Sequence, residues 1–147
     1  MRLPPEERAY VRYRLGRARE ALEEARLLQE AGHLATAVTR IYYACFYAVS
    51  ALLLSEGRGS TKHGGVRALF DRYWVKPGRI SKDRGRFYRE MFERRQESDY
   101  VDLVSYEPEE VAGWRSQAEG FVEEIARLVE KALREQEEQK PPSDSSR

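Results

Sequence analysis

Residues 34–55 read LATAVTRIYYACFYAVSALLLS, and this is the most informative segment of the chain for its fold. Its apolar side chains recur at spacings of three and four, which is the period of an α-helix. A helix that is apolar on nearly every side has to be covered by neighbouring elements. We therefore predict that residues 34–55 form the most buried helix of the protein and that it ends at Glu56-Gly57. Three apolar rows run along it: Tyr42, Phe46, Val49 and Leu53; Ile41, Cys45, Ala48 and Leu52; and Tyr43, Tyr47 and Leu54.

The rest of the chain is also patterned as helices. No stretch sustains the period of two that is typical of a strand. Gly32 suits the left-handed cap after a first helix, and Ser60 or Thr61 suits the N-cap of a short one. The predicted helices span about Pro4–Glu30, His63–Trp74, Lys82–Tyr100 and the residues from Pro108 onward. We expect an all-α fold, an up-and-down bundle of four long helices plus a short one. Residues 1–139 then form a single domain and residues 140–147 a disordered tail.

Length and composition exclude several classes of protein. A chain of 147 residues leaves room for one domain, and a net charge of +1 excludes nucleic-acid binding by bulk charge alone. Cys45 is the single cysteine, so an internal disulfide is excluded. Only His33 and His63 accompany it, and we expect no metal site and no cofactor. We find no signal-peptide pattern, and the nearly apolar run 41–54 is short for a bilayer, so we expect a cytoplasmic protein without a membrane partner.

The charged residues are numerous and unevenly distributed. The chain has 21 Arg, 5 Lys, 20 Glu and no Asn, which is typical either of a thermophile or of a GC-rich genome. Residues 76–95 carry eight basic and three acidic residues, and residues 107–138 carry ten acidic and four basic residues. Phe87, Tyr88 and Phe92 interleave with the arginines, as stacking sites for bases would. The basic segment therefore either binds a phosphate-bearing partner or pairs with the acidic segment, within the bundle or across a dimer.

Three polar side chains fall beside apolar helix faces and are candidates for a binding site. Arg95 is expected either to pair with Asp99, four residues on, or to hold a phosphate. Arg40 lies beside Tyr43 in the apolar helix and either reaches the surface or faces a polar interface. His63 opens the short helix, where its ring either bonds locally or exchanges protons near neutral pH.

Three segments together resemble one family. The first segment is TRIYYACFYA at residues 39–48, followed by ALLL at residues 51–54. The second is TKHGGV at residues 61–66, followed by Phe70, and the third is RQESDY at residues 95–100. In this order they resemble the HEPN family, in particular its small single-domain branch, over about residues 18–132. The resemblance implies a helical bundle that forms a homodimer. It also implies a partner with a minimal nucleotidyltransferase domain, and some such pairs act as toxin and antitoxin.

The resemblance also implies a reaction, because many HEPN proteins are metal-independent ribonucleases. In those proteins a motif Arg stabilises the phosphorane charge, and a motif His, four to six residues along, acts as acid or base. Here Arg95 is present, or Arg94 takes its place, but residues 100–102 are Tyr, Val and Asp where the His belongs. Tyr100 is also nearest to the tyrosine that some partner nucleotidyltransferases modify. The candidate catalytic residues are Arg95, Asp99 and Tyr100, and the candidate RNA- or nucleotide-binding residues are Arg40, Tyr43, His63, Arg94 and Arg95.

Three functions remain open at this point. The first is a homodimer that binds RNA or a nucleotide at Arg95, in a cleft between protomers, and acts with a nucleotidyltransferase. The second is an active metal-independent ribonuclease, and the third is a helical interaction module without catalysis. Aromatic residues beyond what a five-helix monomer needs favour a dimer. They are Tyr42, Tyr43, Tyr47, Tyr88 and Phe92.

Overall fold

The computed structural model describes residues 2–98 and 104–139, and within these ranges it is helical and has no strand. The elements are α1 (Pro5–Glu30), α2 (Leu34–Ser55), α3 (His63–Phe70), a π-helical turn η1 (Asp71–Val75), α4 (Lys82–Ser98) and α5 (Pro108–Glu138). The predicted all-α bundle of four long helices plus a short one is confirmed, and α2 has the predicted bounds. The last two residues predicted for α4, 99 and 100, and the tail 140–147 lie outside the described residues.

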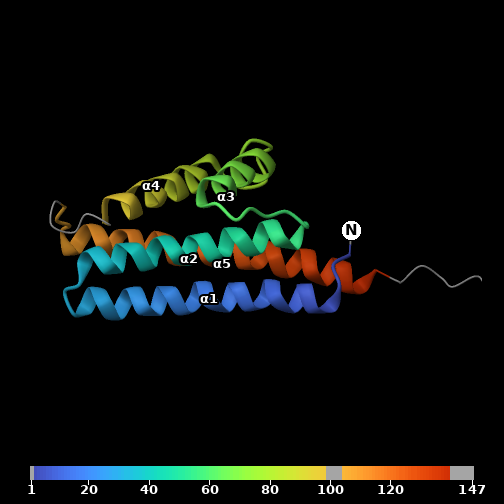
Figure 1. Ribbon diagram of the computed structural model, residues 1–147, viewed down its shortest axis with the longest axis horizontal. Helices are drawn as coiled ribbons and strands as arrows, with labels where there is room; N and C mark the ends of the chain where they lie inside the picture. Colours follow the sequence, from blue (N-terminus) through green and yellow to red (C-terminus); the bar gives the residue numbers. More distant parts are fainter. Residues whose placement is uncertain (1, 99–103, 140–147) are drawn as a thin grey trace, which may run out of the picture.

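Helix α2 occupies the centre of the bundle, as its sequence predicts. In Figure 1 it lies between α1 on one side and the α3–α4 pair on the other, with α5 running alongside. Ile41, Cys45 and Leu52 of its second apolar row are fully buried. By length and composition alone, α2 could cross a membrane, although its nearly apolar run 41–54 by itself is short for a bilayer. Its position in the core accounts for that composition, since 67% of the apolar window is buried in the bundle.

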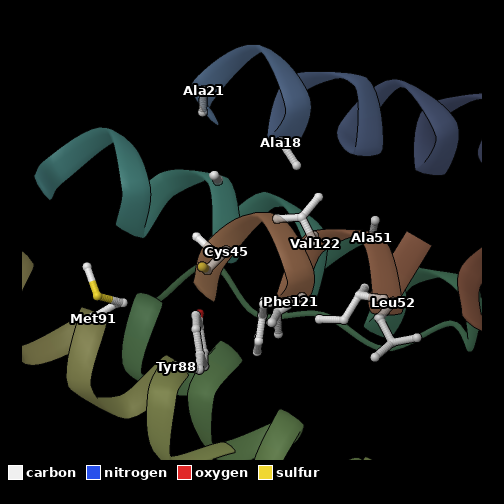
Figure 2. Close-up of a cluster of buried hydrophobic side chains, with 14 of the residues drawn as sticks. Ala18, Ala21, Cys45, Ala51, Leu52, Tyr88, Met91, Phe121 and Val122 are labelled. Atoms are coloured by element: carbon white, nitrogen blue, oxygen red, sulfur yellow. The ribbon is translucent and has the colours of Figure 1, made fainter. Parts of the chain in front are cut away.

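The neighbours of α2 pack through side chains of different size. Helix α1 buries small residues, Ala18, Ala21 and Ala25, so the backbones of α1 and α2 can approach closely. On the other side, Tyr88 of α4 and Phe121 of α5 meet in a stacked pair with centroids 6.0 Å apart (Figure 2). Full burial of one side chain as large as Phe121 stabilises the fold by about 2–3 kcal/mol. The core is therefore alanine-rich towards α1 and aromatic towards α4 and α5.

The sequence predicted some helix ends correctly and others incorrectly. Gly32 caps α1 with a positive φ of 84°, as predicted. The predicted N-cap of α3 is wrong, because the N-cap is Lys62. Ser60 instead accepts a hydrogen bond from the Lys62 backbone N–H at 3.2 Å, within the preceding loop. The helix predicted to run to Trp74 changes to π geometry after Phe70, with a bond from the Lys76 N–H to the Asp71 carbonyl, five residues back, at 2.8 Å.

Burial also corrects the argument for a dimer. Tyr42 and Tyr88 are fully buried within one chain, so they belong to the core and give no sign of an interface. Tyr43, Tyr47 and Phe92 are only half-buried. These three remain the aromatic side chains that a second surface can cover.

Candidate functional site

The two candidate arginines of α4 point to different neighbours. Arg94 lies over the ring of Trp114 in α5, 5.3 Å from its centroid, and pairs with Glu97 at 3.1 Å. Arg95 lies over the ring of Tyr43 in α2, 5.8 Å from its centroid. The structure therefore directs Arg95, and not Arg94, towards the other candidate residues.

Arg95 sits among aromatic rings with part of its guanidinium unpaired. Its Nη2 donates to the Tyr43 hydroxyl at 3.4 Å, and its Cζ lies 5.9 Å from the Tyr42 ring centroid. Its Nε is buried and has no hydrogen-bond partner among the described residues. A buried donor without a partner is destabilising by about 1–3 kcal/mol. An anion that accepts from this N–H removes that penalty.

His63 lies in the same cluster and is held by α2. Its Nδ1 is 2.7 Å from the Tyr42 hydroxyl, and its ring stacks on Phe46 with centroids 4.2 Å apart. Its ring centroid is also 5.7 Å from that of Tyr43. The sequence suggested a local bond at the start of α3, but the ring is bonded to a residue 21 positions earlier.

The environment of His63 fixes its charge. Burial, and secondly the nearby charge of Arg95, lowers the pKa of His63 below its usual value. Burial raises the pKa of Tyr42 well above its usual value, so its hydroxyl keeps the proton. His63 is consequently neutral at pH 7, with Nδ1 bonded to Tyr42 and no hydrogen-bond partner for Nε2 among the described residues. Nε2 accepts a proton in one tautomer and donates one in the other.

Arg40 joins the cluster through Tyr43. Its Cζ lies 4.9 Å from the Tyr43 centroid, and its Nη1 pairs with Glu24 of α1 at 3.3 Å. Arg40 therefore reaches across to a carboxylate, and its charge is partly compensated. The structure brings Arg40, Tyr43, His63 and Arg95 together.

The other arginines of the basic segment pair inside the chain. Arg84 pairs with Glu124 of α5 at 3.4 Å, which is the pairing with the acidic segment that the sequence allowed. The remaining pairs join the segment to itself and to earlier elements: Arg79 with Glu56, Arg86 with Asp83, and Arg89 with Asp71. The positive charge of residues 76–95 is thus largely used within the fold.

Two predicted catalytic residues, Asp99 and Tyr100, lie outside the described residues, so the expected Arg95–Asp99 pair has no observed geometry. Within the described ranges no group of three His, Cys, Asp or Glu side chains is arranged to hold a metal ion. The sequence missed Tyr42 and Phe46 as partners of His63. Both lie in an apolar row of α2, and no spacing rule relates residues so far apart in the chain.

The HEPN domain model matches residues 11–134. The chain belongs to the HEPN domain family. A UPF0332 protein of Thermotoga maritima is 48% identical over 125 residues, covering 85% of this chain and 95% of that protein. A protein of Methanocaldococcus jannaschii named as a candidate toxin is 36% identical over 116 residues, 79% of this chain and 86% of its own. A second candidate toxin of that organism is 32% identical over 94 residues, 64% of each chain.

Proposed function

We propose that this HEPN protein binds single-stranded RNA or a nucleotide through a phosphate at Arg95, and that it is the toxin-like member of a pair with a nucleotidyltransferase. The grouping of Arg95 with Tyr43 and His63 carries the proposal, together with the Nε of Arg95, which is unpaired in the described part of the chain. The Nε of Arg94 is also unpaired there, but Arg94 faces Trp114 and Glu97 instead of this group. A guanidinium matches the geometry of a phosphate and makes strong, charge-assisted hydrogen bonds with it. The related proteins named as candidate toxins support the toxin-like role.

The side chains around Arg95 suit the rest of a nucleotide. Tyr43 and Phe46 are half-buried, so each leaves ring surface to which a base can stack. The Nε2 of the neutral His63 supplies a hydrogen bond beside the phosphate. We expect a second copy of the chain to border this surface, so that Tyr43, Tyr47 and Phe92 lie along a cleft between protomers, because aromatic residues are enriched at interfaces.

Binding of a fluorescently labelled decaribonucleotide, followed by anisotropy at low salt, tests this proposal. Arg95→Ala is expected to weaken binding by about tenfold or more, since a charge-assisted hydrogen bond is removed. Arg86→Ala is the matched control, because Arg86 lies on the same helix and pairs only with Asp83 at the surface. That control is expected to change binding by less than about twofold. Equal effects of the two substitutions would contradict a specific site at Arg95.

His63 favours a second candidate function, metal-independent cleavage of RNA. Its neutral Nε2 would accept the proton of a ribose 2′-hydroxyl, whose oxygen then attacks the adjacent phosphorus. The bond from phosphorus to the 5′-oxygen breaks, the leaving oxygen takes up a proton from water, and a 2′,3′-cyclic phosphate remains, after which His63 gives its proton to the solvent. Arg95 would stabilise the negative charge of the phosphorane. In this reaction His63 supplies the acid–base group that the sequence lacks after Arg95.

The same RNA, incubated in EDTA, separates the two functions. Cleavage that is lost in both His63→Gln and Arg95→Ala supports the ribonuclease. His33→Gln is the control, because His33 is exposed at the start of α2 and makes no side-chain cap. Binding without cleavage leaves the protein as a binding member of the pair.

A further inference from the structure

One hollow of the molecule is lined by residues other than those grouped around Arg95. Its volume is about 300 Å³, and it is bounded by α1, α2, the loop before α3 and the start of α3. That volume is at the lower end of the range for small-molecule sites, about 300–1,000 Å³. Its walls include Tyr10, Arg14, Ser50, Leu53, Leu54 and Thr61.

Two polar groups of this hollow have no hydrogen-bond partner among the described residues. One is the Nε of Arg14, and the other is the hydroxyl of Ser50. Ser50 is only 6% exposed, and a hydroxyl group buried to this extent normally has a hydrogen-bond partner. A ligand that enters the hollow, displaces the side chains that cover these two atoms and offers an acceptor to each satisfies both.

The chemistry of the walls favours an anionic ligand with a flat, apolar part. None of the described residues that line the hollow is acidic, and Arg14 supplies a positive charge. Leu53 and Leu54 give an apolar wall, and the Tyr10 ring, 48% exposed, gives a stacking surface. A nucleotide has all three complementary parts: its phosphate can pair with the cation, its ribose hydroxyl can bond to the wall hydroxyls, and its base can pack on the apolar wall.

A row of rings and cations joins this hollow to Arg95. The Cζ of Arg14 lies 5.5 Å from the Tyr47 ring centroid, and Arg17 lies over the same ring at 5.5 Å. The Tyr47 and Tyr43 centroids are 5.8 Å apart, and Arg95 follows at 5.8 Å from Tyr43. Aromatic rings and cations that follow one another in this way are the pattern by which proteins bind a single strand.

We propose that this hollow, the Arg14–Ser50 pocket, binds one nucleotide, with its phosphate at Arg14, a ribose hydroxyl at Ser50 and its base against Tyr10 and Leu53. The proposal rests on the proposed function in one respect. The nucleotide belongs to the strand whose phosphate is bound at Arg95, a few positions along it. A free nucleoside monophosphate has the same chemistry, and the experiment distinguishes these two sources.

Calorimetric titration of the full chain with a decaribonucleotide and, separately, with nucleoside 5′-monophosphates tests the pocket. Arg14→Gln removes the cation, and Ser50→Leu fills the hollow with an apolar side chain. Each is expected to weaken decaribonucleotide binding by about tenfold, the effect of losing one stacked base. Arg19→Gln is the matched control, because Arg19 lies on α1 and pairs with Glu123 of α5, away from the pocket. It is expected to change binding by less than about twofold. Thermal unfolding midpoints of all variants verify that they are folded.

The outcomes separate this inference from the proposed function. If Arg14→Gln acts only as Arg19→Gln does while Arg95→Ala abolishes binding, the pocket is overturned and the Arg95 site stands. If monophosphates bind and depend on Arg14 while Arg95→Ala leaves decaribonucleotide binding unchanged, the pocket stands, its ligand is a free nucleotide, and the proposed strand at Arg95 fails. If Ser50→Leu halves the mass measured by light scattering, a second copy of the chain fills the hollow and the nucleotide is overturned.

Discussion

Gly85 lies where α4 packs on the π-helical turn η1, and its replacement tests how closely these two elements pack. A Cβ added at Gly85 would lie 2.8 and 2.9 Å from the two γ-methyl carbons of Val75. These distances are shorter than normal van der Waals contacts between carbon atoms, about 3.5–4.0 Å. Gly85→Ala therefore forces α4 away from η1 or distorts Val75.

The size of the effect follows from two opposing contributions. Alanine is more favourable than glycine in a helix by about 0.5–1 kcal/mol. Overpacking by one methyl group in a close contact is unfavourable by about 1–3 kcal/mol. We expect a net loss of about 1–2 kcal/mol, which lowers the unfolding midpoint by about 3–6 °C for a domain of this size.

Gly113 gives the matched control, because it lies in α5 and a Cβ there meets nothing within 4 Å. Gly113→Ala is expected to raise stability by about 0.5–1 kcal/mol. The assay is urea unfolding followed by circular dichroism, with Val75→Ala as the second arm of a double-mutant cycle. In the Val75→Ala chain, Gly85→Ala should become stabilising, since the obstructing carbons are gone. If Gly85→Ala is as destabilising with Val75→Ala as without it, the steric argument is refuted.

Two further predictions concern buried polar groups. Gln136 is 6% exposed; its side chain accepts a hydrogen bond from the Leu3 N–H at 2.8 Å and donates one to the Ser55 carbonyl at 2.9 Å. Gln136→Leu therefore leaves the Leu3 N–H and the Ser55 carbonyl without these hydrogen-bond partners. We expect a loss of about 2 kcal/mol in the free energy of unfolding, measured in urea, and no loss would mean that water satisfies both groups. Folding lowers the pKa of His63, so the unfolded chain binds more protons than the folded chain as the pH falls. The contribution of His63 to stability is therefore present above pH 6.5, and it is lost as the pH falls through the pKa of the folded state. Urea midpoints between pH 7.5 and 5 should therefore fall less steeply for His63→Gln than for the unchanged chain, and parallel curves would show that His63 does not titrate as the structure implies.

Local sequence determined most of the fold. Residues 34–55 are apolar on three helical rows, and a helix with no polar face can be stable only inside other helices, which is where α2 lies. Gly32 ends α1 because it adopts a positive φ at little steric cost. These features depend on residues within a few positions of each other, so spacing rules predict them. The π-helical geometry after Phe70 and the N-cap at Lys62 depend on packing and were not predicted.

The candidate site depends on contacts between distant parts of the chain. Its grouping of residues is therefore visible in the tertiary structure and cannot be predicted from spacing along the sequence. The sequence singled out Arg95 and Arg40 from their position on apolar helices, His63 from its place at the start of the short helix, and Tyr43 as a neighbour of Arg40 within the segment that resembles the HEPN family. It could not choose between Arg94 and Arg95, because a helix turns about 100° per residue and the choice depends on which neighbour covers each side. The bond from Tyr42 to His63 and the unpaired groups of Arg14 and Ser50 exist only where α1, α2 and α3 meet. Periodicity fixes which face of a helix is apolar, whereas the partner of each polar group is fixed by how the helices pack.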